Sequence, residues 1–406
     1  MNIINDVEKI KYDLINIREY FHKYPELSFQ EFKTSQKIAE LLHEIGLDEI
    51  ETGIAKTGVV GVLRGKDEGK TIAIRADIDA LPIQEANDVP YKSQNDGVMH
   101  ACGHDVHITS AIGSAMILSK VKDKLKGNVK FIFQPAEEIF GGAKLMVEEG
   151  VLDKSPKVDA IIALHVWDGI KLGTIGVRTG SAMASADKLE IIVKGKGGHG
   201  AMPNLTNDPI VASAMMINAL QTVVSRSTSP LQPIVLSICK IEGGHAFNII
   251  PTQVIMEGTL RTLDDGVLAN SIEKIESILK GVAESMGVEY KFNYTAGCPV
   301  LVNDADMVEL IKKAGSAIVG EENVINVDPT MGGEDFTYFV RKVPGAMFCL
   351  GVNEGNSSPV HRPTFDVPSE AIGIGVSVLC QAVLMSDSPS VFLHIVKIYP
   401  TIPRAI

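Results

Sequence analysis

The spacing of apolar residues in the first part of the chain predicts helices that alternate with strands. Residues 5–46 carry apolar side chains at helical spacing, among them Ile10, Leu14 and Ile17, and the break at Tyr24-Pro25-Glu26 divides this stretch into two helices. Continuous apolar runs indicate buried strands at 58–63, 71–76, 129–133 and 160–164, the last of which ends at His165. Further helices are expected at 109–125 and 143–149. This alternation predicts an α/β fold.

The pattern changes near residue 180, where strands with alternating apolar and polar residues begin. Strands are expected at 188–194, 235–240, 254–260 and 290–294, and helices at 209–225 and 268–286. Their order is that of a ferredoxin-like α+β unit. The first pattern resumes with a helix at 304–319, a strand at 346–351 and a helix at 370–385. We therefore predict one α/β domain formed by 1–180 and 293–385, an inserted domain at 181–292, and an irregular extension at 386–406.

Composition and charge narrow the classes of protein that fit this chain. A length of 406 residues favours two domains. The net charge of −12 disfavours nucleic acid as a partner. The sequence lacks an apolar run of about 18 residues, which disfavours a membrane span. The 5 cysteines are scattered, and the polar, acidic start is unlike a signal peptide, so we predict a cytoplasmic protein.

Two short segments concentrate residues of the kinds that bind metal ions. Residues 99–107 contain Cys102, three histidines and an aspartate, and residues 134–138 place Glu137 and Glu138 directly after an apolar run. Thiolate, imidazole and carboxylate groups together suit Zn²⁺, Mn²⁺ or Co²⁺. A second carboxylate beside a metal-binding one is what a hydrolytic centre needs as its general base. A metallohydrolase is therefore the leading hypothesis.

Further residues of these kinds follow other predicted strands. Asp77 and Asp79 follow one strand, His165 follows another, and His361 lies in the loop after a third. Active-site groups gather at the carboxyl ends of strands in open α/β sheets. With the two glutamates, residues able to bind a metal follow four separate predicted strands. Such repetition is hard to attribute to chance.

Each of these residues also has an ordinary structural interpretation. Glu137-Glu138 could be a solvated acidic start of a helix, and Asp77 and Asp79 could be a turn or N-cap pair. Asp79 could instead accept a hydrogen bond from a metal-bound histidine and so orient it. We interpret His100 and His107 as structural rather than as metal ligands.

The inserted domain has polar segments of its own. Residues 195–203 are rich in glycine but lack the Lys-Ser/Thr end of a phosphate-binding loop, which disfavours a nucleotide site. Asn248 and Arg261 are candidate substrate contacts. An arginine can hold a carboxylate through two hydrogen bonds, and an asparagine or a histidine can donate to a developing oxyanion.

Six motifs resemble the amidohydrolase branch of the aminoacylase/carboxypeptidase metallopeptidase family. This branch includes bacterial N-acyl-amino-acid deacetylases, hippurate hydrolases and plant auxin-conjugate hydrolases. The motifs lie at 75–82, 99–107, 134–138, 197–203, 332–336 and 361–363. The resemblance implies a mixed-sheet α/β catalytic domain with a two-metal site and a smaller inserted lid domain that often mediates dimerisation.

The resemblance also implies roles for individual residues. The metal ligands, which would hold two divalent ions (Zn²⁺, Mn²⁺ or Co²⁺), would be Cys102, His104, Glu138, His165 and His361. Glu137 would be the general base that takes a proton from water at the metals. His199 would stabilise the oxyanion, in some relatives across a dimer interface. Asn248 and Arg261 would lie near the substrate carboxylate.

The combined prediction is hydrolysis of the amide bond of N-acyl amino acids, of the N-acetyl or N-benzoyl type, by a homo-oligomer assembled through the inserted domain. A dipeptidase or carboxypeptidase on the same scaffold is the alternative, and a non-catalytic ligand-binding protein is a third possibility. The acidic side chain of Glu137 argues against the third, because the fold has no structural need for it. The chain departs from the family at Asp168-Gly169 and at His245. Of these, His245 could alter the acyl or side-chain pocket.

Overall fold

The computed structural model describes residues 2–355 and 358–386 and divides the chain into two compact units. Of the described residues, unit 1 contains 2–180, 302–328 and 335–386, and unit 2 contains Ser181–Leu301 and Pro329–Glu334. The main segment of unit 2 extends beyond the predicted end at 292, because strand β13 (Glu289–Cys298) runs past that residue. Apart from Ser386, the predicted extension at 386–406 lies outside the described residues.

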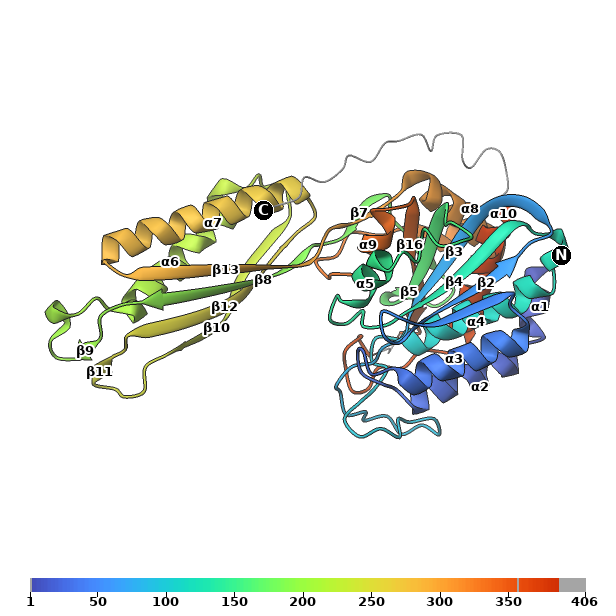
Figure 1. Cartoon of the computed structure of the whole chain (residues 1–406), viewed down its shortest axis with the longest axis horizontal. Coiled ribbons are helices and arrows are strands. Elements are labelled where there is room, and N and C mark those ends of the chain that lie inside the picture. Colours follow the sequence, from blue (N-terminus) through green and yellow to red (C-terminus); the bar gives the residue numbers. More distant parts are fainter. Residues whose placement is uncertain (1, 356–357, 387–406) are drawn as a thin grey trace. The chain divides into compact units, whose positions relative to one another are not determined.

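Unit 1 is built on an eight-stranded mixed sheet with the strand order β1-β2-β4-β3-β5-β16-β6-β15 (Figure 1). Its strands are β1 (Glu49–Ile54), β2 (Gly58–Arg64), β3 (Asp67–Asp77), β4 (Lys126–Gln134), β5 (Ala160–Lys171), β6 (Ile175–Val177), β15 (Val324–Asn326) and β16 (Gly345–Asn353). The central strands β4, β3, β5 and β16 are parallel to one another. They are buried along most of their length, as is typical of parallel strands that are covered on both faces.

Helices of unit 1 pack around this sheet, with α4 at the centre of the core. They are α1 (Ile3–Glu8), α2 (Lys11–Lys23), α3 (Phe32–Ile45), α4 (His104–Ser119), α5 (Gly142–Glu148), α8 (Ala305–Val319), α9 (Thr337–Val340) and α10 (Glu370–Met385), with short 3-10 turns η1 (Lys122–Lys124) and η4 (Glu321–Asn323). Helix α4 contacts α2, α3, α10 and strand β3, and nearly all of its residues are buried. Burial on every side explains why its sequence has no amphipathic period, and why the predicted range 109–125 missed its start.

Unit 2 is an antiparallel sheet with the strand order β10-β12-β8-β13 and two long helices. Its elements are β8 (Ala186–Lys194), β9 (Gly198–His199), η2 (Pro203–Leu205), α6 (Pro209–Thr222), η3 (Val223–Ser227), β10 (Ile234–Gly243), β11 (Ile249–Ile250), β12 (Gln253–Thr262), α7 (Asp265–Met286) and β13. The four sheet strands and two helices follow the predicted strand–helix–strand–strand–helix–strand order. Two short strands, β7 (Gly180–Met183) and β14 (Leu301–Asn303), lie where the chain passes between the units. None of the described helices is long and apolar enough to cross a membrane.

Candidate metal centre

Three central strands of unit 1 deliver the candidate ligands to one edge of the sheet. Strand β3 ends at Asp77, which pairs with Gln134 at the end of β4, so Asp79 and the two glutamates follow at the same level. The prediction that the strand beginning near residue 160 ends at His165 was wrong, because β5 continues to Lys171 and stays paired with β16 beyond His165. Arg75 of β3 pairs with Ala163 of β5. His165, two residues further on, therefore still lies level with the ends of β3 and β4.

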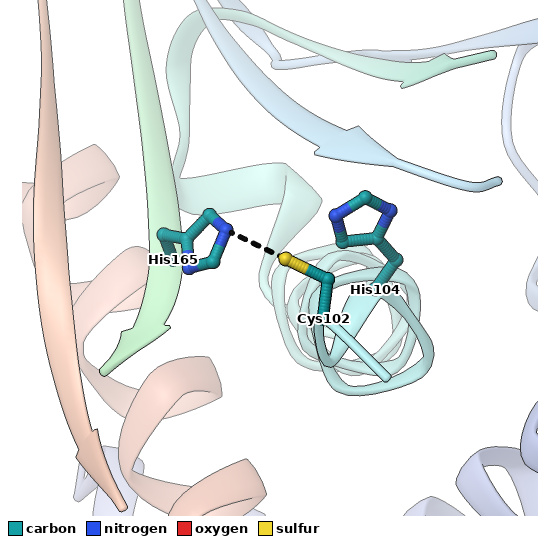
Figure 2. Close-up of side chains that lie close together, drawn as sticks. All are labelled: Cys102, His104 and His165. Atoms are coloured by element: carbon teal, nitrogen blue, oxygen red, sulfur yellow. Dashed lines mark hydrogen bonds between the residues drawn. The ribbon is translucent and has the colours of Figure 1, made fainter. Parts of the chain in front are cut away.

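The Cys102–His104 segment approaches this edge from the start of helix α4. Gly103 between the two ligands has φ +88°, and a Cβ atom there would lie 2.4 Å from Cγ2 of Val166. Only glycine can adopt this conformation without strain or collision. Figure 2 shows the result, with the Cys102 thiol between the rings of His104 and His165.

The five predicted metal ligands converge in unit 1. Sγ of Cys102 lies 3.5 Å from Nε2 of His165 and 3.3 Å from Nε2 of His361. Oε1 of Glu138 lies 3.5 Å from Nε2 of His361 and 3.9 Å from Nε2 of His104. Ligands at usual Zn–N and Zn–S bond lengths in a tetrahedron would be roughly 3.3–3.8 Å apart. The cluster therefore has the spacing that metal ions require.

Hydrogen bonding leaves the inward-facing atoms of this cluster available. Nδ1 of His104 bonds the Asp79 carbonyl at 2.9 Å, and Nδ1 of His165 bonds the Val166 carbonyl at 2.7 Å. Each interaction orients the ring and directs Nε2 to the centre, as is usual for metal-binding histidines. Nε2 of His104 and Oε1 of Glu138 are buried without a hydrogen-bond partner among the described residues. Unpaired buried polar atoms are costly, so the donor set fits a metal site.

Asp79 supports this centre through hydrogen bonds to the residues that carry the candidate ligands. Its Oδ1 and Oδ2 accept hydrogen bonds from the backbone N–H groups of Glu137 and Glu138, each at 3.1 Å, and Ser28 donates to Oδ2 at 2.7 Å. Oδ1 also lies 3.4 Å from Nδ1 of His104. Asp79 thus links the histidine that starts α4 to the turn that carries both glutamates.

His107 and Asp77 lie beside the cluster but are used in other bonds. Nδ1 of His107 lies 2.5 Å from Oδ1 of Asp77, and its Nε2 accepts from the Val166 N–H at 3.0 Å. Burial lowers the pKa of His107 to about 4, although the Asp77 carboxylate opposes this shift. Because both ring nitrogens are engaged, the geometry agrees with a structural role for His107.

Arg75, a buried arginine to which the sequence alone assigned no role, supports the same strand ends. Arg75 donates to Gln134 at 2.7 Å, to Asp77 at 2.6 Å and to Asp335 at 3.2 Å. Burial raises the pKa of Asp77, but the positive charge of Arg75 and the neighbouring histidines outweigh burial and hold this pKa well below its usual value. Asp335 also accepts from the Ala143 N–H at 3.0 Å. The signal that could have revealed this network is the presence of Arg75 and Asp335 within two of the family motifs.

A second buried polar network joins α2 to the start of α4. Arg18 donates to Asp105 at 2.7 Å and to Asp366 at 2.6 Å. The His22 ring lies between two carboxylates, 2.8 Å from Asp105 and 3.2 Å from Glu85. This network holds Asp105 in the first turn of α4.

The predicted residues of unit 2 occupy two different places. Strand β9 pairs with β11, His199 opposite Ile249, and the Asn248 carbonyl accepts from the Gly200 N–H at 2.8 Å. His199 and Asn248 are both exposed on this two-stranded ribbon. Arg261 lies near the other end of strand β12, where it donates to the Met331 carbonyl at 3.0 Å. Eight residues separate Arg261 from Gln253 at the ribbon end of β12, a span of about 26 Å. The structure thus brings His199 and Asn248 together but places Arg261 apart from them within unit 2.

Comparison with known proteins shows that this chain is similar to peptidases and deacetylases. The profile of Peptidase family M20/M25/M40 matches residues 73–385. The chain is 42% identical over 361 residues to N-acetylcysteine deacetylase of Bacillus subtilis (strain 168), covering 89% of this chain and 93% of that protein. It is 39% identical over 378 residues to thermostable carboxypeptidase 2 of Saccharolobus solfataricus, covering 91% and 94%. A crystal structure of the Bacillus subtilis YxeP protein, described as a dinuclear metal binding peptidase from the M20 family, matches with TM-score 0.83 and 37% identity, covering 94% and 99%.

Proposed function

The chain is a member of peptidase family M20/M25/M40, and from this premise we propose that it is a metal-dependent amidohydrolase that cleaves the amide bond of N-acyl amino acids. The products would be a carboxylate and a free amino acid. One observation carries the proposal: five ligand-type side chains converge beside Glu137, a second carboxylate that is only 5% exposed. The named activity of the 42% identical deacetylase supports N-acyl amino acids as the substrate class.

Two divalent ions would be held by Cys102, His104, Glu138, His165 and His361. When bound, such ions lower the pKa of water toward neutrality and polarise the scissile carbonyl. Cys102 would serve as the thiolate, since only that form binds a metal. The dinuclear description of the structurally similar YxeP protein supports two ions.

Glu137 would act as the general base and then as the general acid. Its backbone N–H is fixed by Asp79, and it directly precedes the proposed ligand Glu138. Its carboxylate would take a proton from the attacking water and return it to the leaving nitrogen. Such proton transfer typically contributes about 10²–10⁴-fold to the rate.

His199 would stabilise the oxyanion. Its Nδ1 accepts a hydrogen bond from the Ala201 N–H at 3.0 Å. In a neutral ring this leaves the proton on Nε2, which can then donate to a developing negative charge. Asn248, on the same ribbon, and Arg261 would bind the substrate through its polar groups.

We propose a homo-oligomer in which the residues of unit 2 serve sites in different copies. His199 and Asn248 lie on the ribbon, whereas Arg261 lies at the other end of β12. The two places are about 26 Å apart along the strand, which is too far for both to reach one small substrate. Helix α6 carries the exposed apolar side chains Ile210, Val211 and Met215, which offer contact area to a second copy. None of the 5 cysteines, all of which are described, forms a disulfide, which supports a cytoplasmic location.

A carboxypeptidase or dipeptidase is the second candidate, because a relative of 39% identity is named a carboxypeptidase. The deciding experiment measures amino-acid release from N-acetyl and N-benzoyl amino acids and from dipeptides, using protein stripped by a chelator and reloaded with Mn²⁺, Zn²⁺ or Co²⁺. Metal-dependent release from acyl amino acids is the expected result. Release from dipeptides alone would favour the second candidate, and metal-loaded protein inactive on the whole panel would contradict both.

A further inference from the structure

The turn that carries Glu137 and Glu138 has a backbone that its own sequence does not favour. Ala136, before the pair, has φ +53°, and Phe140, after it, has φ +54°. Residues with a Cβ atom rarely adopt this left-handed conformation. Such a conformation persists where surrounding contacts determine it, and it clusters at functional sites. The contacts that hold this turn are therefore of interest for the reaction.

Three successive backbone N–H groups of the turn each donate to a buried carboxylate. The N–H groups of Glu137 and Glu138 bind the two oxygens of Asp79. The N–H of Ala136 binds Oε1 of Glu31 at 2.9 Å, across 105 positions of sequence. The three bonds fix the backbone immediately before and at the proposed base.

Glu31 is built into the core for this contact. It is fully buried, and its second oxygen accepts from the Thr57 hydroxyl at 2.6 Å. Among the described residues, its hydrogen-bond partners are Thr57 and the Ala136 N–H, and neither is a cation. Burial raises the pKa of the Glu31 carboxyl above its usual value, and these hydrogen bonds offset only part of that shift. A buried carboxylate is costly for stability, so its position directly before α3 needs an explanation other than folding.

The loop that contains Glu31 also reaches the rest of the turn. Ser28 donates to Asp79 at 2.7 Å, and a Cβ atom at Gly141 would lie 3.1 Å from the Phe29 ring. The Glu26 carbonyl accepts from the Ala80 N–H at 2.8 Å. One short N-terminal loop thus contacts both segments that support the candidate centre.

We propose that Glu31 is a positioning residue for the reaction, which sets the direction of the Glu137 carboxylate by holding the Ala136 N–H. The inference rests on the proposed function, in which Glu137 is the base. Glu31 is not among the residues that could hold a metal ion or that we propose to bind the substrate, so its effect should fall on kcat rather than on KM or on metal content.

The test compares two substitutions of similar size. Glu31→Gln keeps a carbonyl oxygen that can accept from Ala136, whereas Glu31→Leu removes every acceptor. We expect Glu31→Leu to lower kcat by about ten- to a hundredfold at unchanged KM and metal content, and Glu31→Gln to stay within about threefold of the wild type. Asp304→Leu is the matched control, since it removes another carboxylate of unit 1 that accepts hydrogen bonds from backbone N–H groups but lies at the start of α8, away from this turn.

Hydrogen exchange of peptides that cover 135–142 provides a readout that needs no activity. Exchange should become faster in Glu31→Leu and stay slow in Glu31→Gln and Asp304→Leu. Wild-type kcat in Glu31→Leu, equal losses in both Glu31 variants, or the same loss in Asp304→Leu would each overturn the proposal. If metal-loaded wild type cleaves no amide, the proposed function fails, and the exchange rates still decide whether Glu31 holds the turn.

Discussion

The candidate metal centre of unit 1 and the β9–β11 ribbon of unit 2 differ in how their polar side chains are supported. Cys102, His104 and His165 are buried, and the backbone beside them is held by carboxylates that are buried themselves. His199 and Asn248 are exposed on a ribbon of two residues per strand. The centre contains its own supports, whereas the ribbon presents its polar groups at an exposed surface.

This difference separates two kinds of contribution to a reaction. A buried, hydrogen-bonded centre keeps its geometry before substrate arrives, and such preorganisation is a large source of electrostatic catalysis. Exposed groups on a ribbon contribute only when another surface meets them. Changes in unit 1 should therefore affect proton transfer and metal binding, and changes in the ribbon should affect substrate binding and transition-state stabilisation but not metal binding.

The largest effect is expected from removing the base inside the centre. Glu137→Ala should lower kcat by about 10²–10⁴-fold, because the attacking water loses its proton acceptor. Metal content, measured by atomic emission, should equal that of the wild type, since Glu137 is not among the proposed ligands. Turnover preserved in the metal-loaded variant would rule out this role.

A somewhat smaller effect is expected on the ribbon. His199→Ala should lower kcat by about 10²–10³-fold, the usual loss for one oxyanion donor, and leave metal affinity unchanged. Mixing this variant with Glu137→Ala should recover activity, because a mixed oligomer can combine an intact centre with an intact ribbon. Failure of the mixture, with subunit exchange demonstrated, would mean that each copy uses its own His199.

The support of the centre can be tested through Asp79. Asp79→Ala removes the acceptors of the Glu137 and Glu138 N–H groups and a carboxylate beside His104, so we expect metal affinity about 10–100-fold weaker. Calorimetric titration of the stripped protein measures this directly. Unchanged affinity would show that the His104 bond to the Asp79 carbonyl is sufficient.

The smallest expected effect concerns pH and the second buried network of unit 1. Burial lowers the pKa of His22, but its hydrogen bonds with Asp105 and Glu85 more than reverse this and raise it to about 8. Protonated His22 therefore stabilises the fold fully below the unfolded pKa of about 6.5, and this contribution, at most about 2 kcal/mol, is lost as pH rises through about 8. Denaturant unfolding at pH 6 and pH 9 measures this contribution. Between these two pH values, the free energy of unfolding should fall more for the wild type than for His22→Gln. Equal drops would contradict the shifted pKa.

Much of the fold followed from local pattern. The α/β alternation was predicted because buried strands and helices differ in hydrophobic period, and the order of elements in unit 2 was predicted for the same reason. The metallohydrolase hypothesis arose because Cys102, His104 and the two glutamates lie in two short segments of unusual composition, whereas the assignment of individual ligands, His165 and His361 included, came from the family resemblance. The start of α4 was missed, since a helix buried on every side has no polar face to mark its first turn.

The sequence by itself therefore determined the class of fold and the residues able to bind metals, because periodicity and residue type are local properties. Only the tertiary structure showed that Glu31 holds the turn after β4, across 105 positions of sequence, and that Asp335 binds Gln134 at the end of β4, across 201 positions. It also showed that Arg261 lies at the far end of β12 from His199. Bonds between distant segments leave no period in the chain, because the folded backbone alone brings those segments together.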